Sequence, residues 1–214
     1  CSAYVIGDHG LYNALYDAGI TIDDVSPDYV VVGETTTYGY EHILRAMNLV
    51  NKGAKLIATN TDITGPIEGG IAPACRAFVA PIEATTGKQA YYVGKPNPLM
   101  MRTGLRILGV HSNEAVMIGD RMDTDVIAGI ETGLDTVLVL SGVSTRETVD
   151  EFPYRPRLIL NGVGDIALGG AGAAGLGDFQ RQRALGILVC VIAGAAVNSE
   201  TNLNGIGSGV LVSL

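Results

Sequence analysis

Two short motifs in the middle of the chain carry side chains that could handle a phosphate group. Lys95 lies in a Gly-Lys-Pro turn directly after the apolar run 90–93. A second apolar run, 115–118, stops at a glycine and is followed by three acids within six residues: Asp120, Asp123 and Asp125. In an open α/β sheet, functional groups gather where buried parallel strands end. A lysine and a carboxylate cluster in such places suit phosphoryl transfer with a hard divalent ion such as Mg²⁺, which takes carboxylate oxygens and keeps waters.

Both motifs also have a purely structural explanation. Acids directly before a helix cap its free N–H groups and are favoured at the positive end of its dipole, and this is the role we expect for Asp123. A lysine in a turn can simply be solvated. However, only one helix, which Pro96 or Pro98 can start, separates the two motifs. Their combination favours a site over two unrelated features.

Composition and charge limit the class of protein. Of the 214 residues, 47% are apolar and 17% charged, which is enough to build a packed core. The net charge of −8 and the lack of a basic run argue against a nucleic-acid partner. The three cysteines, Cys1, Cys75 and Cys190, are an odd number without metal-type spacing, as in a reduced chain without disulfides. We expect no signal peptide before the first strand. We therefore expect a cytoplasmic protein.

Apolar patterning predicts alternating strands and helices. In the first 90 residues we expect strands at 3–7, 29–33 and 55–59, and helices at 11–18, 40–50 and 73–85, with Pro81 kinking or splitting the last helix. Further along we expect strands at 115–118, 136–140 and 157–160, the last at a sheet edge. Helices are expected at 100–108 and 124–133, after Ser144 or Thr145, and from 163. Such alternation predicts an α/β fold with mainly parallel sheets.

The strand at 55–59 ends in Asn60-Thr61-Asp62, where Asn60 and Asp62 are candidates for substrate binding. Their side chains could hydrogen-bond substrate hydroxyls or hold their own loop as an Asx-turn, and the sequence leaves both roles open. For Glu34, after the strand at 29–33, we expect helix capping. The three histidines, His9, His42 and His111, share no metal-type spacing, and we expect them to be structural or solvated.

Seven collinear segments resemble the haloacid dehalogenase (HAD) superfamily of phosphatases, and within it the class IIA branch of NagD and the nitrophenylphosphatases. The Lys95 and Asp120 motifs match the third and fourth motifs of that superfamily. The segments are Tyr-Val-Ile-Gly (4–7), Val-Val-Gly-Glu-Thr (31–35), Leu-Ile-Ala-Thr-Asn-Thr-Asp (56–62), Pro-Ala-Cys (73–75), Tyr-Val-Gly-Lys-Pro-Asn-Pro (92–98), Ile-Gly-Asp-Arg-Met-Asp-Thr-Asp (118–125) and Leu-Val-Leu-Ser-Gly-Val-Ser (138–144).

The resemblance implies a domain organisation and a reaction. Residues 1–90 would form a C2-type α/β cap domain that selects the substrate, and residues 91–167 the second half of a Rossmann-like parallel-sheet core. Lys95 would be catalytic, and Asp120 and Asp125 would serve the metal, Mg²⁺. The substrates would be small phosphomonoesters such as nucleotide monophosphates or sugar phosphates, hydrolysed through an aspartyl-phosphate.

The nucleophile of that reaction has no match in the chain. The family uses an Asp-x-Asp near its amino terminus, whereas the only Asp-x-Asp among the 214 residues is Asp123-Thr-Asp125, which already belongs to the fourth motif. The nearest substitute is Asp8, which is followed by His-Gly. A catalytically inactive fragment that binds phosphate compounds or a partner is therefore the alternative to a phosphatase.

Residues 168–214 do not match the family. Residues 169–177 are rich in glycine and alanine and predict a flexible linker. The apolar run 185–197 is shorter than the roughly twenty residues of a membrane span, so we expect a buried helix or strand there. A membrane-associated or purely structural protein is the third interpretation of the function. The sequence does not decide whether the protein forms a homo-oligomer.

Overall fold

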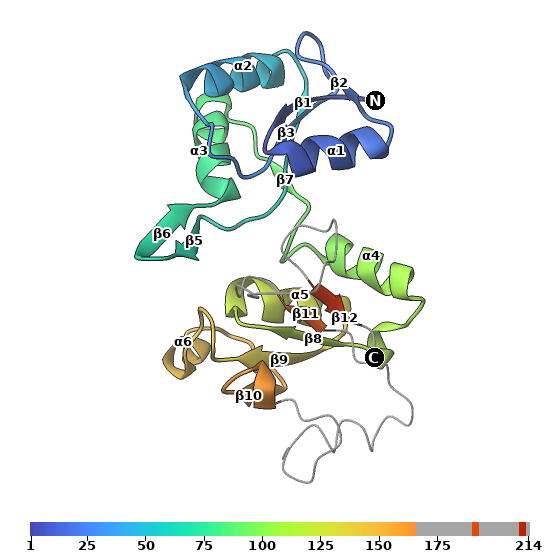
Figure 1. Cartoon of the computed structure of the whole chain (residues 1–214), viewed down its shortest axis with the longest axis vertical. Helices are drawn as coiled ribbons and strands as arrows, with labels where there is room; N and C mark the ends of the chain where they lie inside the picture. The colour runs from blue at the N-terminus through green and yellow to red at the C-terminus, as the bar shows by residue number, and fades with distance from the viewer. Residues whose placement is uncertain (166–189, 193–209, 213–214) are drawn as a thin grey trace. The chain divides into compact units, whose positions relative to one another are not determined.

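The computed structural model describes residues 1–165, 190–192 and 210–212 and divides the chain into two compact units, Cys1–Lys95 and Pro96–Leu214 (Figure 1). This division lies five residues beyond the predicted boundary at residue 90. The roles of the two parts as cap and partial core stay predictions from the resemblance.

The first unit is built on a five-stranded parallel sheet in the order β2-β1-β3-β4-β7. Its strands are β1 (Ser2–Ile6), β2 (Thr21–Ile22), β3 (Tyr29–Val32), β4 (Lys55–Ala58) and β7 (Tyr91–Tyr92). Its helices are α1 (His9–Asp17), α2 (Tyr40–Asn51) and α3 (Cys75–Thr86). An antiparallel hairpin, β5 (Thr64–Ile67) and β6 (Gly70–Pro73), precedes α3. The strands expected at 3–7, 29–33 and 55–59, the helices expected at 11–18 and 40–50, and the parallel sheet are confirmed, with ends that differ by at most two residues.

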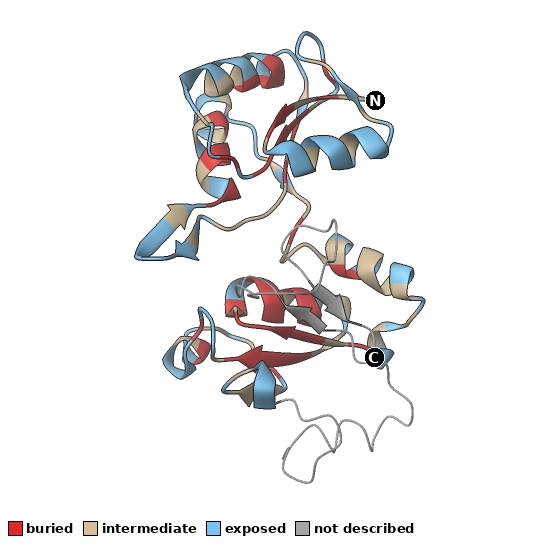
Figure 2. Cartoon of the chain, in the orientation of Figure 1, coloured by how far each residue is buried: buried red, intermediate tan, exposed pale blue. Residues whose placement is uncertain are grey.

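The alternation of side chains along the strands explains the three layers of this unit, because successive residues point to opposite faces of the sheet. One face forms a buried cluster with α2 and α3: Ile6, Val30, Val32, Ala46, Leu49, Val50, Leu56, Ala58, Cys75, Phe78, Val79 and Ile82. On the other face Ala3, Val5 and Val31 pack with Leu11 and Leu15 of α1. Figure 2 shows the buried strands between largely exposed outer helix surfaces.

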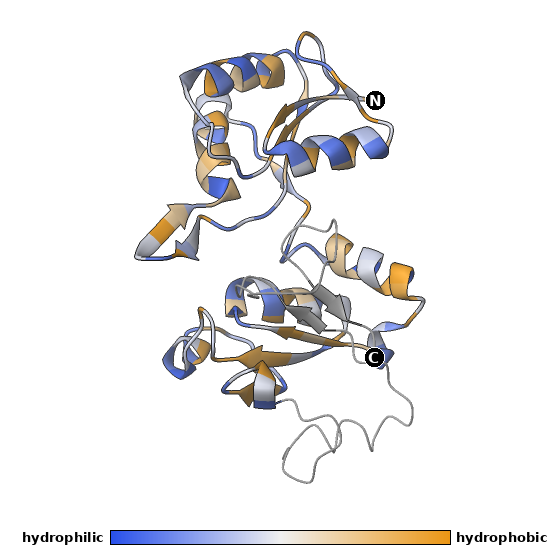
Figure 3. Ribbon diagram, viewed as in Figure 1, coloured by the Kyte–Doolittle hydropathy of each residue, from blue (hydrophilic) through white to orange (hydrophobic). Residues whose placement is uncertain are grey.

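The second unit contains a three-stranded parallel sheet in the order β10-β9-β8. The strands are β8 (Val116–Gly119), β9 (Asp135–Val139) and β10 (Leu158–Leu160), and the helices are α4 (Pro98–Leu108), α5 (Ile127–Thr132) and α6 (Arg146–Asp150). Met117 packs with α4 and α5, whereas Leu138 packs with Val149 of α6. Strands β8 and β9 consist largely of hydrophobic residues (Figure 3). The short strands β11 (Cys190–Ile192) and β12 (Val210–Val212) pair antiparallel, and β11 contacts β8.

Several predicted elements need correction. α3 runs without a break through Pro81, because Phe78, Val79 and Ile82 bury one side of it in the core, and Pro73 ends β6 instead of starting the helix. The run before Lys95 is not buried: β7 is an edge strand and the side chain of Tyr91 is exposed.

Further differences concern the ends of elements in the second unit. The helix predicted at 124–133 begins as a π-turn, Met122–Val126, before α5. The helix predicted from 163 is a 3₁₀ turn, Val163–Asp165, in the described part of the chain. In the stretch 168–214 only residues 190–192 and 210–212 are described, so the predicted linker and most of the apolar run lie outside the described residues. Within the described residues, no helix combines the length and apolar character needed to cross a bilayer.

Candidate functional site

The segment after β8 is organised around the carboxylate of Asp125, which is fully buried. Its Oδ2 accepts hydrogen bonds from the backbone N–H groups of Asp120 and Arg121, both at 3.1 Å. Gly119 leaves room for it, because a Cβ at that position would lie 2.4 Å from the same oxygen. Asp125 therefore holds the loop that presents Asp120.

The two oxygens of the Asp120 carboxylate differ in their surroundings. Oδ2 accepts a hydrogen bond of 2.9 Å from the backbone N–H of Val143. Oδ1 is buried and has no hydrogen-bond partner among the described residues. Gly142 permits this approach, because a Cβ there would lie 1.9 Å from Oδ2. A buried carboxylate oxygen without a partner is costly in a native protein and suggests a missing ligand. A hard cation is the ligand that fits a carboxylate oxygen.

The described residues do not complete a metal site by themselves. No group of three or more His, Cys, Asp or Glu side chains able to hold an ion occurs in the described part of the chain. Mg²⁺ is commonly bound by one or two carboxylates while its other positions are filled by waters and substrate phosphate. Asp120 therefore suits a metal that takes only one or two ligands from the protein. It does not suit a structural metal whose ligands all come from the protein.

Asp123 does not cap a helix, contrary to our expectation. Its two carboxylate oxygens accept hydrogen bonds from the Arg121 guanidinium at 3.0 and 2.7 Å, and its side chain is half exposed. No side-chain cap forms at the start of the π-turn. Exposed ion pairs of this kind contribute about 1 kcal/mol or less to the free energy of unfolding.

The turn of Lys95 is fixed to the end of β4. The N–H of Val93 donates to the carbonyl of Ala58 at 2.9 Å, and the hydroxyl of Thr61 donates to the carbonyl of Lys95 at 3.0 Å. Between them, Gly94 is buried so closely that a Cβ would lie 2.2 Å from the carbonyl oxygen of Thr59. Asn97 then caps α4 by accepting from the N–H of Leu99 at 2.9 Å.

Lys95 is the last residue of the first unit, whereas Asp120 and Asp125 belong to the second. The combination of the lysine with the carboxylates in one site stays a prediction from the sequence.

Asn60 holds its own loop, which is one of the two roles left open by the sequence. Its Oδ1 accepts from the N–H of Asp62 at 3.0 Å, and its Nδ2 donates to Oε1 of Glu34 at 3.1 Å. Glu34 therefore pairs with Asn60, while Gly39 occupies the N-cap position of α2, so the capping role expected for Glu34 is wrong. A role of Asn60 and Asp62 in substrate binding stays a prediction.

His42 and His111 take part in local structure, whereas His9 is exposed at the start of α1. His111 is the N-cap residue of the 3₁₀ turn Ser112–Glu114, and its N–H donates to Oε2 of Glu114 at 2.8 Å. The ring of His42 stacks on Tyr38 with 6.2 Å between centroids. Burial raises the pKa of Tyr38 to about 12, and its hydroxyl donates to the carbonyl of Phe78.

Asp8, the substitute nucleophile, is exposed at the N-cap position of α1.

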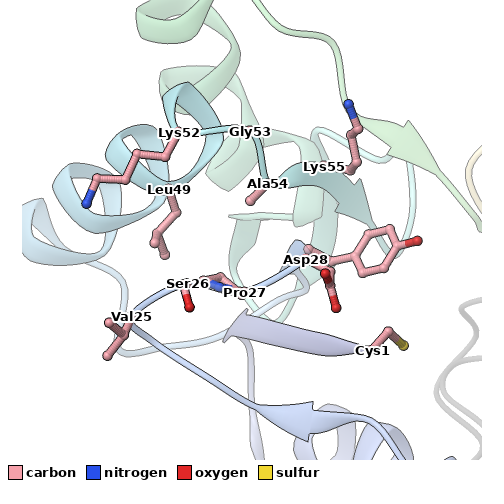
Figure 4. Close-up of a pocket in the computed structure, with 11 residues that line it drawn as sticks. Cys1, Val25, Ser26, Pro27, Asp28, Leu49, Lys52, Gly53, Ala54 and Lys55 are labelled. Atoms are coloured by element: carbon pink, nitrogen blue, oxygen red, sulfur yellow. The ribbon is translucent and has the colours of Figure 1, made fainter.

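A pocket of about 630 Å³ in the first unit lies at the amino-terminal ends of β1, β3 and β4 (Figure 4). It is lined by the segments 25–29 and 52–55, which lead into β3 and β4, together with Cys1 and Leu49. Asn60 and Asp62 instead follow the carboxyl end of β4. The pocket is therefore separate from the loop that contains Asn60 and Asp62.

Comparison with known proteins places these motifs in a family. Residues 92–166 match the HAD-hydrolase-like family model. The chain is 51% identical over 166 residues to a dihydroxyacetone phosphatase of Corynebacterium glutamicum, covering 78% of this chain and 60% of that protein. It is 46% identical over 164 residues to the ribonucleotide monophosphatase NagD of Escherichia coli, covering 77% of this chain and 64% of NagD. It thus spans less than two thirds of the length of these curated relatives.

Solved structures show the same similarity in the fold. The structure of NagD from E. coli K-12 matches with a TM-score of 0.73 at 45% identity, over 78% of this chain and 65% of that one. The structure of Bs-TpNPPase matches with a TM-score of 0.73 at 40% identity, over 78% of this chain and 67% of that one. The α/β fold class is thereby confirmed. On these similarities, the chain belongs to the HAD superfamily of hydrolases, in the class IIA branch that contains NagD and the nitrophenylphosphatases.

Proposed function

We propose that this chain provides the metal-binding carboxylate, the phosphate-neutralising lysine and the substrate-selecting domain of a Mg²⁺-dependent phosphatase. The observation that carries the proposal is the carboxylate of Asp120: one oxygen is held by Val143, and the other is buried without a partner among the described residues. The names of the two curated relatives, both phosphatases, support this reading.

The residues of the chain would divide the work as follows. Asp120 would hold Mg²⁺ through its second carboxylate oxygen, and Asp125 would keep the loop and the metal's waters in place. When bound, Mg²⁺ would supply Lewis-acid polarisation of a phosphoryl oxygen. The cationic side chain of Lys95 would neutralise the carboxylates and the negative charge that develops on the phosphoryl group.

The covalent step needs a nucleophile in addition to these residues. By analogy with the family, an aspartate would attack phosphorus, the bond to the ester oxygen would break, and water would then hydrolyse the aspartyl-phosphate. The Asp-x-Asp at 123–125 does not offer this group, because Asp123 is paired with Arg121 and Asp125 is fully buried against backbone N–H groups. We therefore propose that the nucleophile is not among these 214 residues.

The proposed substrates are small phosphomonoesters such as nucleotide monophosphates or sugar phosphates. The two curated relatives are named as a dihydroxyacetone phosphatase and a ribonucleotide monophosphatase. In this chain the loop after β4, with Asn60 and Asp62, would contribute to the choice among them. We further propose a cytoplasmic protein without a nucleic-acid or membrane partner, in keeping with its net charge of −8, and leave a homo-oligomer open.

A second candidate function is a catalytically inactive chain that binds phosphate compounds or a partner. It is favoured by the unmatched nucleophile motif and by the exposure of Asp8, the nearest substitute. Both functions share a site for metal and phosphate, and phosphate release separates them.

Calorimetric titration of the chain with orthophosphate, with and without Mg²⁺, tests the shared site. We expect orthophosphate to bind more tightly when Mg²⁺ is present, because Mg²⁺ bound by one or two carboxylates takes phosphate oxygens as further ligands. Asp120→Ala should remove this dependence on Mg²⁺, and Lys95→Ala should weaken orthophosphate binding under both conditions. An unchanged titration in both variants would contradict the proposed roles. Asp123→Ala, which removes only an exposed ion pair, is the matched control.

A further inference from the structure

The loop after β9 makes three hydrogen bonds to the segment that carries Asp120. The N–H of Val143 donates to Oδ2 of Asp120 at 2.9 Å, across 23 positions of the chain. The N–H of Ser144 donates to the backbone carbonyl of Asp120 at 2.9 Å. The Oγ of Ser144 accepts from the N–H of Met122 at 3.1 Å. A distant loop thus contacts both the side chain and the backbone of the candidate metal ligand.

Ser144 binds this segment on both sides of Arg121, once at Asp120 and once at Met122. Its side chain is buried, with 7% exposure, and Met122 is fully buried. Because buried N–H groups need acceptors, the N–H of Met122 depends on this hydroxyl oxygen. The two bonds restrain the peptide groups around Asp120, and with them the direction of its Cα–Cβ bond.

We propose that Ser144 is a positioning residue for Asp120, which fixes the backbone so that Val143 takes one carboxylate oxygen and the other is presented to a divalent cation. The proposal rests on the metal site of the proposed function and deepens it. Partners outside the direct ligand set orient a ligating carboxylate, and their loss typically weakens metal binding about 10- to 100-fold. Ser144 itself need not touch the metal.

Affinity for metal is the readout, since it does not depend on turnover. The free Mn²⁺ signal in electron paramagnetic resonance gives the dissociation constant of the chain for Mn²⁺, and competition gives that for Mg²⁺. Ser144→Ala removes the acceptor for Met122 and should weaken both affinities about tenfold or more. Ser144→Thr keeps the hydroxyl oxygen and should restore most of the affinity. Ser144→Cys, with a weak acceptor of similar size, should lie between them.

Thr145→Ala is the matched control for a merely structural effect. Thr145 is the adjacent hydroxyl residue and caps α6 by accepting from the N–H of Thr148 at 3.4 Å. Its loss should lower stability, as expected for a helix cap, without touching Asp120. We expect an unchanged dissociation constant for Mn²⁺ in this variant.

The outcomes separate this inference from the proposed function. Wild-type affinity in a folded Ser144→Ala variant would overturn the positioning role while leaving the metal site intact. A lack of Mn²⁺ and Mg²⁺ binding by the wild-type chain would overturn both. If Ser144→Ala does not fold, the ranking of Thr above Cys decides the matter, and equal affinities of these two variants would count against the role.

Discussion

Replacing Asp125 by alanine is expected to lower the free energy of unfolding of the second unit by about 3 kcal/mol and to remove measurable Mg²⁺ binding. The side chain is fully buried, and it is the acceptor for the N–H groups of Asp120 and Arg121. Alanine would leave these groups without their acceptor beside a cavity, and each unsatisfied buried group costs about 1–3 kcal/mol. The loop that presents Asp120 would then lose its fixed shape.

Urea unfolding followed by circular dichroism measures the stability, and calorimetry measures the Mg²⁺ affinity. Asp123→Ala is the control in the same loop, because it removes only the half-exposed pair with Arg121 and should cost about 1 kcal/mol or less. Equal losses in the two variants would contradict the central position that we assign to Asp125.

Replacing Gly142 by alanine is expected to weaken Mg²⁺ binding about 10- to 100-fold with a much smaller change in stability. A Cβ at this position would lie 1.9 Å from Oδ2 of Asp120 and 2.5 Å from its Cγ, so the carboxylate would have to move. The displaced carboxylate would lose its geometry toward Val143 and toward the cation. Gly142 itself is exposed in a loop, so the hydrophobic core would not be disturbed.

Gly164→Ala provides the control, because a Cβ at Gly164 meets nothing within 4 Å. Calorimetric titration with Mg²⁺ and thermal unfolding of both variants make the comparison. Gly142→Ala with the affinity of the wild type would show that Asp120 is not the group that binds the metal.

The fold was largely predictable because apolar periodicity and glycine positions follow directly from backbone geometry. The strands around Val30 and Leu56 and the helix Tyr40–Asn51 were expected close to their observed bounds. The split that Pro81 could have caused does not occur, because the buried packing of the residues around it outweighs the lost hydrogen bond. The hairpin Thr64–Pro73 was missed, since its exposed, glycine-rich sequence lacks a clear alternation of apolar and polar residues.

The candidate site was predictable only where side chains carry the chemistry. Asp120 and Asp125 stand out because acids follow an apolar run that ends at Gly119. The bond from Val143 to Asp120 was not predictable, because its donor is a backbone N–H from 23 positions away, which leaves no signature in the residue type. The pairing of Glu34 with Asn60 was missed for a related reason: it depends on β3 and β4 being neighbours in the sheet.

Phosphate release from p-nitrophenyl phosphate, with and without Mg²⁺, tests the central claim that this chain provides the metal and phosphate part of a phosphatase site. The sample is the folded 214-residue chain, alone and mixed with a polypeptide that carries the family's Asp-x-Asp segment. We expect no release by the chain alone, and Mg²⁺-dependent release in the mixture that Asp120→Ala abolishes. Release by the chain alone would contradict the missing nucleophile and make Asp8 the first residue to replace. A mixture that binds Mg²⁺ and phosphate without release would contradict the phosphatase function and favour the inactive chain.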